Sequence, residues 1–343
     1  MDAKQAFREL KQGRIAPVYV IFGTESYLMN EFVERLQESL VQPEHRDMGI
    51  VRFDTAETPV DQIVDEAETL PFLVPSKLIL VRDSVLFASG KESSRVEHRP
   101  ERLQAYMAQP LESTVLVFMV PHEKLDERKK LVKSVKSGDG TVSFSPLHAD
   151  ELQQWLLKRA TGQGRSMGAP VAEELLRRVG TDMHALAAET DKLCLHAGAG
   201  GAVTLDAVKS LVPMATEQNV FKLTEELAAL RTEAAITLYY DLLKQREEPI
   251  KLLALLVRQF RNMLYVKELS SQGYSPQQMA SQIGLHPYAV KITGEQARKF
   301  SQRRLATLLS ELADLDYAMK SGRVDKSLGL ELFLLKTGSR GAS

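Results

Sequence analysis

The residues that most resemble a site for chemistry lie near the N-terminus, in the segment 18–28 (VYVIFGTESYL). The apolar run Val18–Phe22 leads through Gly23 into an amphipathic stretch, which is the order of a buried strand, a turn and a helix. Nucleotide-binding proteins place the phosphate loop G-x-x-x-x-G-K-[ST] at such a junction, because amides, a lysine and a hydroxyl must converge on the phosphates and magnesium. This segment has one glycine, no lysine, and Glu25, whose carboxylate favours the first helical turn but would repel a phosphate. The sequence therefore predicts the architecture of an ATPase without its chemistry.

The second half of an ATPase site would be acidic residues directly after a buried strand, where they hold magnesium and orient water. The strongest strand signal, Thr114–Val120, is followed by Pro-His-Glu, and Glu123 alone could supply one half of that site. Without a phosphate loop, we interpret Glu123 as a solvated loop residue. Asp61 and Asp65 share a helix face without a second set of ligands, and the histidines are scattered. We therefore expect no catalytic residue, no cofactor and no metal site.

The connector Leu70–Pro75 (LPFLVP) places bulky apolar residues where a solvent-facing segment is expected. One interpretation is that these side chains plug the edge of a sheet. The other is a preformed apolar wedge for a protein partner, since the two bracketing prolines reduce the entropy lost on docking. Anchors of this type can each contribute more than ~2 kcal/mol at an interface. The residues alone support both interpretations equally.

A basic run begins at Asp126 and continues through Arg128, Lys129 and Lys130 to Lys133 and Lys136. We predict a helix here. A solvated face is the usual role of such a run. The alternative is contact with DNA phosphates or an acidic partner, which would be salt-dependent and blind to sequence. The candidate contact residues for that alternative are Arg128, Lys129, Lys130 and Lys133.

The segment 273–291 (GYSPQQMASQIGLHPYAVK) is typical of two short helices joined by a turn at Gly284. Ser275 is a plausible N-cap, and Pro276 suits the first helical position. The pattern is similar to a DNA-reading helix-turn-helix. However, the second helix offers few base-reading side chains, and Tyr288 is one of several residues suited to packing. We favour a structural helical corner.

Composition excludes several classes of protein. The chain length of 343 residues is too great for one ordinary hydrophobic core, which predicts two or three domains. Lys+Arg (44) and Asp+Glu (45) nearly balance, so any DNA contact must come from a local patch. The single cysteine, Cys194, excludes a disulfide framework and a cysteine-rich zinc site, and fits a reducing cytoplasm. The polar N-terminus has no apolar signal core, and no apolar run is long enough to span a bilayer.

Elements alternate between strand and helix over residues 1–145, which predicts a largely parallel, covered sheet. The expected strands are Val18–Phe22, Ile50–Asp54, Lys77–Arg82, Thr114–Val120 and Thr141–Phe144. We expect a mobile loop at 84–100. After Pro146 the strand signal disappears, and two helical blocks follow at 146–213 and 214–343. The glycine-rich stretch 196–202 lacks the flanks of a phosphate cradle and is interpreted as a flexible connector.

With these pieces placed, nearly the whole chain resembles the delta subunit of the bacterial DNA polymerase III clamp loader, and more closely the Gram-positive versions. Each motif alone is weak, and their order and spacing together make the resemblance specific. The segments that carry it are Phe22–Leu28, Leu70–Leu73 before the strand Lys77–Arg82, Leu125–Lys130 after the strand Thr114–Val120, Ala188–Leu193, Asn219–Leu223, Arg258–Arg261, His286–Tyr288 and Asp316–Gly322.

The resemblance implies an AAA+-like α/β clamp-binding domain without a P-loop (1–145), a small helical lid (146–213) and a helical collar for oligomerisation (214–343). It implies a subunit that grips the sliding clamp and opens the ring for loading on primed DNA during replication, without binding ATP. The implied partners are the clamp (beta subunit), the ATP-binding tau/gamma subunits, delta-prime, and primed DNA within the complex. No intrinsic catalytic site is expected, although the family is part of the DNA-directed DNA polymerase III holoenzyme.

The family's clamp-binding wedge is a pair of adjacent bulky apolar residues between a helix and a strand. The matching positions are Phe72 and Leu73, with Leu70 and Val74 as flanking contacts, and the order Phe-Leu reverses the Leu-Phe of the enterobacterial version. ATP in the partner subunits would control exposure of the wedge. The competing hypotheses are a degenerate P-loop NTPase and a helix-turn-helix DNA-binding regulator that uses Gly273–Lys291.

Overall fold

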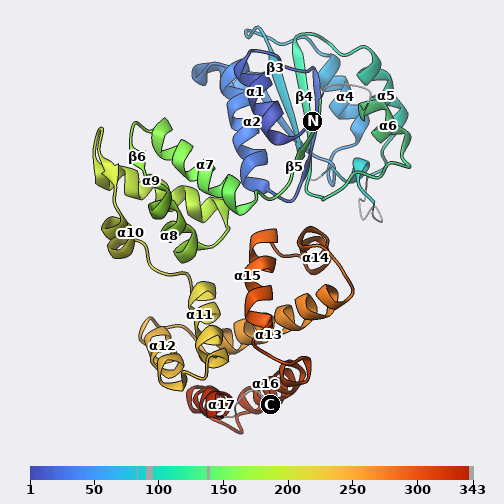
Figure 1. The fold of residues 1–343 in the computed structure, drawn as a ribbon. Coiled ribbons are helices and arrows are strands. Elements are labelled where there is room, and N and C mark those ends of the chain that lie inside the picture. Colours follow the sequence, from blue (N-terminus) through green and yellow to red (C-terminus); the bar gives the residue numbers. More distant parts are fainter. Residues whose placement is uncertain (83, 90–95, 137–139, 340–343) are drawn as a thin grey trace. The chain divides into compact units, whose positions relative to one another are not determined.

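The computed structural model describes residues 1–82, 84–89, 96–136 and 140–339. The chain divides into two compact units, Met1–Pro146 and Leu147–Ser343 (Figure 1). The first unit is an α/β unit and the second is largely helical. The finer division of the second unit into a lid and a collar stays a prediction.

A five-stranded, all-parallel sheet forms the centre of the first unit, in the order β2-β3-β4-β1-β5. The strands are β1 (Val18–Gly23), β2 (Ile50–Asp54), β3 (Lys77–Arg82), β4 (Thr114–Val120) and β5 (Thr141–Phe144). The central strands β1, β3 and β4 are nearly continuous apolar runs because both faces of the sheet are covered. The largely parallel, covered sheet predicted for this unit is confirmed, and β2 to β5 have the predicted bounds.

Helices cover both faces of this sheet (Figure 1). One face packs against α1 (Ala3–Lys11) and α2 (Ser26–Leu40), and its centre is the fully buried Phe32. The Phe32 ring lies 5.4 Å from that of Tyr19 and 5.7 Å from that of Phe144 between centroids. The other face packs against α4 (Val60–Glu68), α5 (Pro100–Ala108) and α6 (Lys130–Lys136). The short segments η1 (Pro43–His45) and α3 (Arg46–Gly49) precede β2.

The predicted mobile loop at 84–100 is wrong in its first part. Val85–Phe87 forms a 3-10 turn (η2), and Phe87 and Leu86 are buried in the core beside α4 and α5. The backbone N–H of Asp126 donates a hydrogen bond to the carbonyl of Phe87 at 2.8 Å, which fixes the turn. The serine-rich composition of the segment concealed these apolar residues. Residues 90–95 lie outside the described part.

The first half of the second unit contains four helices: α7 (Ala149–Gly162), α8 (Ala169–Val179), α9 (Met183–Ala197) and α10 (Leu205–Leu211). It also contains a two-stranded parallel pair, β6 (Ser166–Met167) with β7 (Ala202–Val203). The expectation of no strand after Pro146 was therefore wrong. Two-residue strands carry too little periodicity to be seen in a sequence, and the glycine-rich stretch 196–202 serves to lead α9 back into β7.

The described part of the second half contains seven helices: α11 (Thr216–Ala228), α12 (Thr232–Lys244), α13 (Pro249–Ser271), α14 (Pro276–Ile283), α15 (Pro287–Ala297), α16 (Gln302–Lys320) and α17 (Lys326–Ser339). Six of them share one apolar core, with Tyr239, Phe260 and Leu305 at or below 1% exposure, and α14 packs in a smaller cluster with Val290 and Val266. None of the helices in the described ranges combines the length and apolar character that a bilayer crossing requires.

Candidate functional site

The carboxyl edge of the parallel sheet, where an α/β protein holds a nucleotide, is closed by backbone contacts. Gly23 ends β1 with φ +142°, and a Cβ atom at this position would lie 2.0 Å from the carbonyl oxygen of Phe144. The backbone N–H of Glu25 donates a hydrogen bond to the same carbonyl at 3.1 Å. The glycine is therefore required by the close approach of β5.

Glu25 is the N-cap of α2, one residue before the first-turn position that the sequence predicted. Its Oε1 accepts a hydrogen bond from the backbone N–H of Tyr27 at 3.3 Å. The carboxylate thus occupies a free amide at the helix start, which is the group that a phosphate would use. The side chain stabilises the turn and adds negative charge where a nucleotide would need positive charge.

The position after β4 also lacks the features of a magnesium site. The strand ends at Val120, whose carbonyl accepts a hydrogen bond from the His122 N–H at 2.8 Å, and Glu123 is exposed. Asp61 and Asp65 form ion pairs with Arg99 (3.7 Å) and Arg102 (2.7 Å), respectively. Across the described ranges, no three His, Cys, Asp or Glu side chains gather as a metal site would require.

The connector Leu70–Pro75 lies at the opposite, amino-terminal edge of the sheet. It joins the end of α4 to the start of β3, and Lys77 at that start pairs with Thr114, the first residue of β4. Because the strands are parallel, the junction after β1 lies at the far end of the strands. A six-residue strand separates the two edges by roughly 20 Å.

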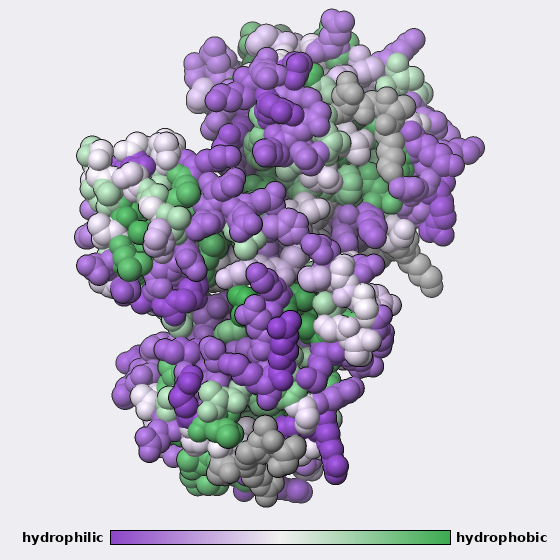
Figure 2. Space-filling view, viewed as in Figure 1, coloured by the Kyte–Doolittle hydropathy of each residue, from purple (hydrophilic) through white to green (hydrophobic). Residues whose placement is uncertain are grey.

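The apolar side chains of this connector point to solvent, with one exception. Leu70, Phe72 and Leu73 are 71%, 79% and 68% exposed, whereas Val74 is 9% exposed. Hydrophilic residues cover most of the face seen in Figure 2, so large exposed side chains of this kind need an explanation. The interpretation as a plug of the sheet edge is wrong for Leu70, Phe72 and Leu73, because they do not pack. Val74 was predicted to be a flanking contact for the partner, but its side chain is buried.

Leu73 adopts a left-handed backbone conformation, with φ +62°. This conformation costs a non-glycine residue roughly 1–2 kcal/mol, because Cβ approaches the following carbonyl. Strain of this type persists only where the surrounding structure holds it, and it gathers at binding segments. Here it turns the chain so that Phe72 and Leu73 both face outward while Val74 returns to the core.

Lys77 holds the two ends of the connector together. Its side chain is 5% exposed, and Nζ donates hydrogen bonds to the carbonyl oxygens of Glu66 (2.5 Å) and Thr69 (2.9 Å) and to Glu66 Oε1 (2.7 Å). These carbonyls belong to the last turn and C-cap of α4, where a cation is favoured by the helix dipole. Sequence reasoning missed this role, although a lysine opening an otherwise apolar strand was a usable signal.

The sequence predicted one helix for the basic run from Asp126 onward, and this prediction is wrong in its first part. Helix α6 begins at Lys130, and residues 126–129 form a turn. Asp126 is 9% exposed and accepts three hydrogen bonds from Arg128, from Nε (2.9 Å), from the guanidinium NH2 group (2.8 Å) and from the backbone N–H (3.1 Å). These bonds hold the pKa of the Asp126 carboxyl well below its usual range.

The other basic candidates lie on the surface of this turn and helix. Lys130 and Lys133 are exposed on α6, and Lys129 is half-buried in the preceding turn. Asp126 forms an ion pair with Arg128, whereas Lys130 and Lys133 present their charges on the exposed side of α6.

The helix-turn-helix candidate is a packed corner, as favoured. Ser275 caps α14 in a capping box with Gln278, and Gly284 ends the helix in the left-handed conformation. Val290 on α15 is 1% exposed and packs with Met279 and Val266. The second helix thus uses its apolar side chains for packing within the unit.

Comparison with known proteins gives the same result for both units. Residues 19–144 match a family model described as "DNA polymerase III, delta subunit", and residues 217–337 match "DNA polymerase III delta subunit, C-terminal domain". The DNA polymerase III subunit delta of Bacillus subtilis (strain 168) is 38% identical over 330 residues, which cover 96% of this chain and 95% of that protein.

A more distant curated relative is the probable DNA polymerase III subunit delta of Aquifex aeolicus (strain VF5). It is 23% identical over 305 residues, which cover 87% of this chain and 85% of that protein. Among solved structures, the Bacillus subtilis DNA clamp loader delta protein matches with a TM-score of 0.83 and 38% identity, covering 98% of this chain and 100% of that chain. The higher identity to the Bacillus subtilis protein agrees with the predicted resemblance to Gram-positive versions.

Proposed function

The chain belongs to the DNA polymerase III delta subunit family, and from this premise we propose that it binds the sliding clamp and opens the ring for loading on primed DNA. The proposed contact residues are Phe72 and Leu73, with Leu70 beside them. Val74 would serve as the anchor that returns the connector to the core. The observation that carries this proposal is the exposure of three large apolar side chains on one short connector. The two ends of this connector are held together by hydrogen bonds from Lys77 to the end of α4.

The connector is organised before it meets a partner. Pro71 and Pro75 restrict the backbone, and Lys77 ties the start of β3 to the end of α4. Because these constraints already exist in the free protein, little conformational entropy is lost when the connector docks. Most of the interaction energy of Phe72 and Leu73 is then available for binding.

Ring opening would follow from preferential binding to the open clamp. A ligand shifts an equilibrium only by its difference in affinity for the two states. Two anchors contributing ~2 kcal/mol each could shift a closed ring towards the open form by up to ~1,000-fold, since 1.4 kcal/mol corresponds to tenfold. The subunit would thus open the ring by binding alone, without hydrolysing ATP.

The nucleotide edge of the sheet supports a subunit that does not itself bind ATP. Glu25 caps α2 at the place of a phosphate, and the β1–α2 junction is closed against Phe144. We propose that the tau/gamma subunits bind ATP in the complex and control when the connector is exposed. The chain would therefore have no catalytic site of its own.

The proposed collar offers a surface for assembly with the tau/gamma subunits and delta-prime. Leu328, Leu332 and Leu335 on α17 are 51%, 53% and 41% exposed. Their spacing of four and three residues places them on one helix face. An apolar stripe of this kind fits a helix–helix interface with another subunit.

The last part of the proposal is contact with primed DNA through α6 and the turn before it. Lys130 and Lys133 are exposed on α6 and could approach phosphates in the assembled complex. Such contact would be independent of base sequence and would weaken with salt.

The test is clamp binding by a double substitution, Phe72→Ala with Leu73→Ala. Loss of two anchors of ~2 kcal/mol each predicts a fall in affinity of about 1,000-fold, measured by surface plasmon resonance on immobilised clamp. Both side chains are exposed, so the urea unfolding midpoint should not fall. Clamp affinity equal to that of the unsubstituted chain would disprove the assignment.

A matched control is the pair Leu195→Ala with Leu205→Ala. These leucines are also exposed, at 78% and 37%, but lie in the second unit. Their removal should leave clamp affinity unchanged. Equilibrium titration with a fluorescent ATP analogue tests the rival hypothesis, because micromolar affinity of the isolated chain would favour a degenerate P-loop NTPase.

A further inference from the structure

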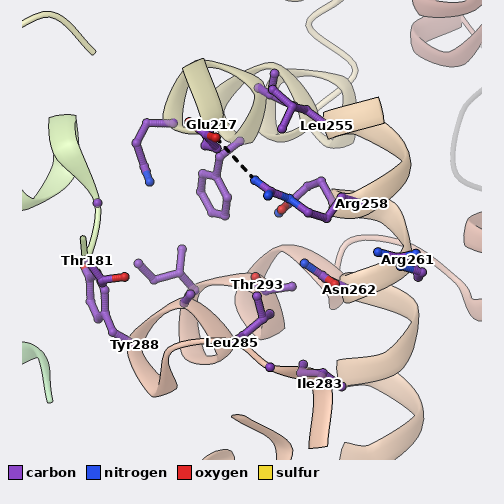
Figure 3. A pocket seen from close by; sticks show the side chains of 18 of the residues that line it. Thr181, Glu217, Leu255, Arg258, Arg261, Asn262, Ile283, Leu285, Tyr288 and Thr293 are labelled. Carbon is purple, nitrogen blue, oxygen red and sulfur yellow. Dashed lines mark ion pairs between the residues drawn. The ribbon is translucent and has the colours of Figure 1, made fainter. Parts of the chain in front are cut away.

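A cavity of about 370 Å³ lies within the second unit, among α11, α13, the corner of α14 and α15, and the end of α8 with the turn that follows it (Figure 3). This volume is at the lower end of the range typical of ligand pockets, about 300–1,000 Å³. The cavity lies more than a hundred residues along the chain from the connector Leu70–Pro75, in the other compact unit. None of the roles proposed above uses it.

The floor of the cavity carries two buried polar side chains. Asn262 on α13 is 8% exposed and Thr293 on α15 is 4% exposed, and both line the cavity. Within the described ranges, neither side chain makes a hydrogen bond to another residue. Figure 3 shows the Asn262 amide directed towards the open space. The polar atoms of both side chains are open to the cavity, so they remain available for hydrogen bonds to a ligand.

Two arginines stand on the same face of α13. Arg258 and Arg261 are exposed, line the cavity, and are three residues apart, which places them on one helix face. Arg258 lies 3.8 Å from Glu217 on α11, a loose ion pair that leaves most of its donors available. Arg261 has no carboxylate partner in the described part of the chain. The charged lining therefore has a net charge of about +1.

A hydrogen-bond network fixes the walls. Gln296 donates to the carbonyl of Phe221 at 3.0 Å and accepts from Gln259 Nε2 at 2.9 Å, which links α15 to α11 and α13. Gln296 itself is 3% exposed. Because these bonds hold three helices at once, the cavity is a feature of the folded unit. Its apolar lining includes Leu255, Leu285, Ile292 and the rings of Phe221 and Tyr288.

We propose that this cavity binds a short segment of another protein that carries an apolar side chain next to a carboxylate. The apolar walls would take the side chain, the two arginines would bind the carboxylate, and Asn262 and Thr293 would bond the peptide backbone. Arginine suits this role because its planar fork binds a carboxylate through two hydrogen bonds.

Nucleotides and DNA fit the cavity less well. A polyphosphate would bring several negative charges against Glu217, and only a net charge of about +1 is present to receive them. The lining also lacks the lysine and consecutive glycine amides of a phosphate cradle. A single carboxylate matches the charge of the site.

The experiment titrates the full chain with N-acetyl-phenylalanyl-glutamate amide and follows binding by NMR. The neutral glutamine analogue and AMP serve as comparison ligands. For a ligand of this size we expect binding in the range of roughly 0.1–1 mM, and about tenfold weaker binding of the glutamine analogue. Arg258→Gln with Arg261→Gln should remove this tenfold preference.

The controls separate binding from folding. Arg298→Gln removes an exposed arginine at the end of α15 outside the cavity and should change nothing. Asn262→Leu keeps similar volume and should weaken both peptides, with the urea midpoint as a check of the fold. Equal binding of the two peptides, tighter binding of AMP, or a preference that persists in the double arginine variant would overturn the proposal.

Discussion

Leu73 is both a proposed contact residue and a site of backbone strain. Its side chain is 68% exposed, and its φ of +62° lies where bulky residues are rare. A residue that is neither packed nor relaxed contributes little to folding. Both features are explained if the side chain is held ready for a partner.

Leu73→Gly separates stability from binding. Glycine adopts positive φ without strain, so we expect the free energy of unfolding to rise by about 0.5–1 kcal/mol. Loss of an anchor worth ~2 kcal/mol should lower clamp affinity by about 30-fold. Urea denaturation and surface plasmon resonance measure the two quantities on the same sample.

The matched control is Leu230→Gly. Leu230 also has positive φ, +58°, and is 49% exposed, but it lies in the turn after α11. We expect a similar gain in stability with unchanged clamp affinity. If Leu73→Gly kept full clamp affinity, the role assigned to this side chain would be wrong.

Among the elements, the end of α4 determines how the connector is presented. Lys77→Met removes a buried ammonium group and leaves the carbonyls of Glu66 and Thr69 without their partner. We expect a loss of about 2–4 kcal/mol in the free energy of unfolding, measured in urea. Clamp affinity should also fall, because the two ends of the connector would no longer be held together by Lys77.

Arg102→Met is the comparison for Lys77→Met. Arg102 on α5 forms ion pairs with Asp65 and Glu68 on α4, the helix that Lys77 contacts, but the Arg102 side chain is 44% exposed. An exposed pair contributes about 0–1 kcal/mol, so this variant should be nearly as stable as the unsubstituted chain. Equal losses in the two variants would contradict the role given to burial at Lys77.

The N-cap of α15 predicts a dependence of stability on pH. His286 Nδ1 accepts a hydrogen bond from the Tyr288 N–H at 3.1 Å, and burial lowers the pKa of His286, with a smaller contribution from His148. The unfolded chain therefore binds a proton at higher pH than the folded chain does. Stability should be full above pH 6.5, the ordinary value, and should decline as the pH falls below it.

His286→Asn tests this prediction, since asparagine can cap a helix without titrating in this range. Thermal unfolding between pH 7.5 and pH 5.5 should show a smaller decline for this variant. The low pKa of Glu174, about 2, is set by Arg177 and affects stability only below about pH 4.5, outside this window. An identical decline in both proteins would remove His286 as the cause.

The elements that sequence predicted well are those with long or strong patterns. Strands such as Thr114–Val120 were located to the residue because both faces are covered and the apolar run is unbroken. The pair β6 and β7 was missed because two residues have no detectable period. The helix expected from Asp126 starts later, because the side chain of Asp126 bonds to Arg128 instead of continuing the backbone pattern.

The candidate site was predictable only in part. The prolines and apolar residues of Leu70–Pro75 indicated a special segment, but exposure of Phe72 and burial of Val74 depend on one backbone angle. The role of Lys77 depends on carbonyls eight and eleven residues earlier in the chain. Neither kind of information is carried by local composition.

At the scale of the whole molecule, the parallel sheet of the first unit has no room for a nucleotide at one end of its strands and presents the proposed clamp-binding residues at the other. The edge after β1 is closed by Glu25 and Phe144, and the edge before β3 presents Phe72 and Leu73. The account predicts that this chain opens the clamp by binding alone.

The most direct measurement is release of a fluorescent clamp from nicked circular DNA by the purified chain without nucleotide. We predict that the chain shortens the lifetime of the clamp on DNA, and that Phe72→Ala with Leu73→Ala does not. A clamp lifetime unchanged by the unsubstituted chain, or shortened equally by the double variant, would contradict the account.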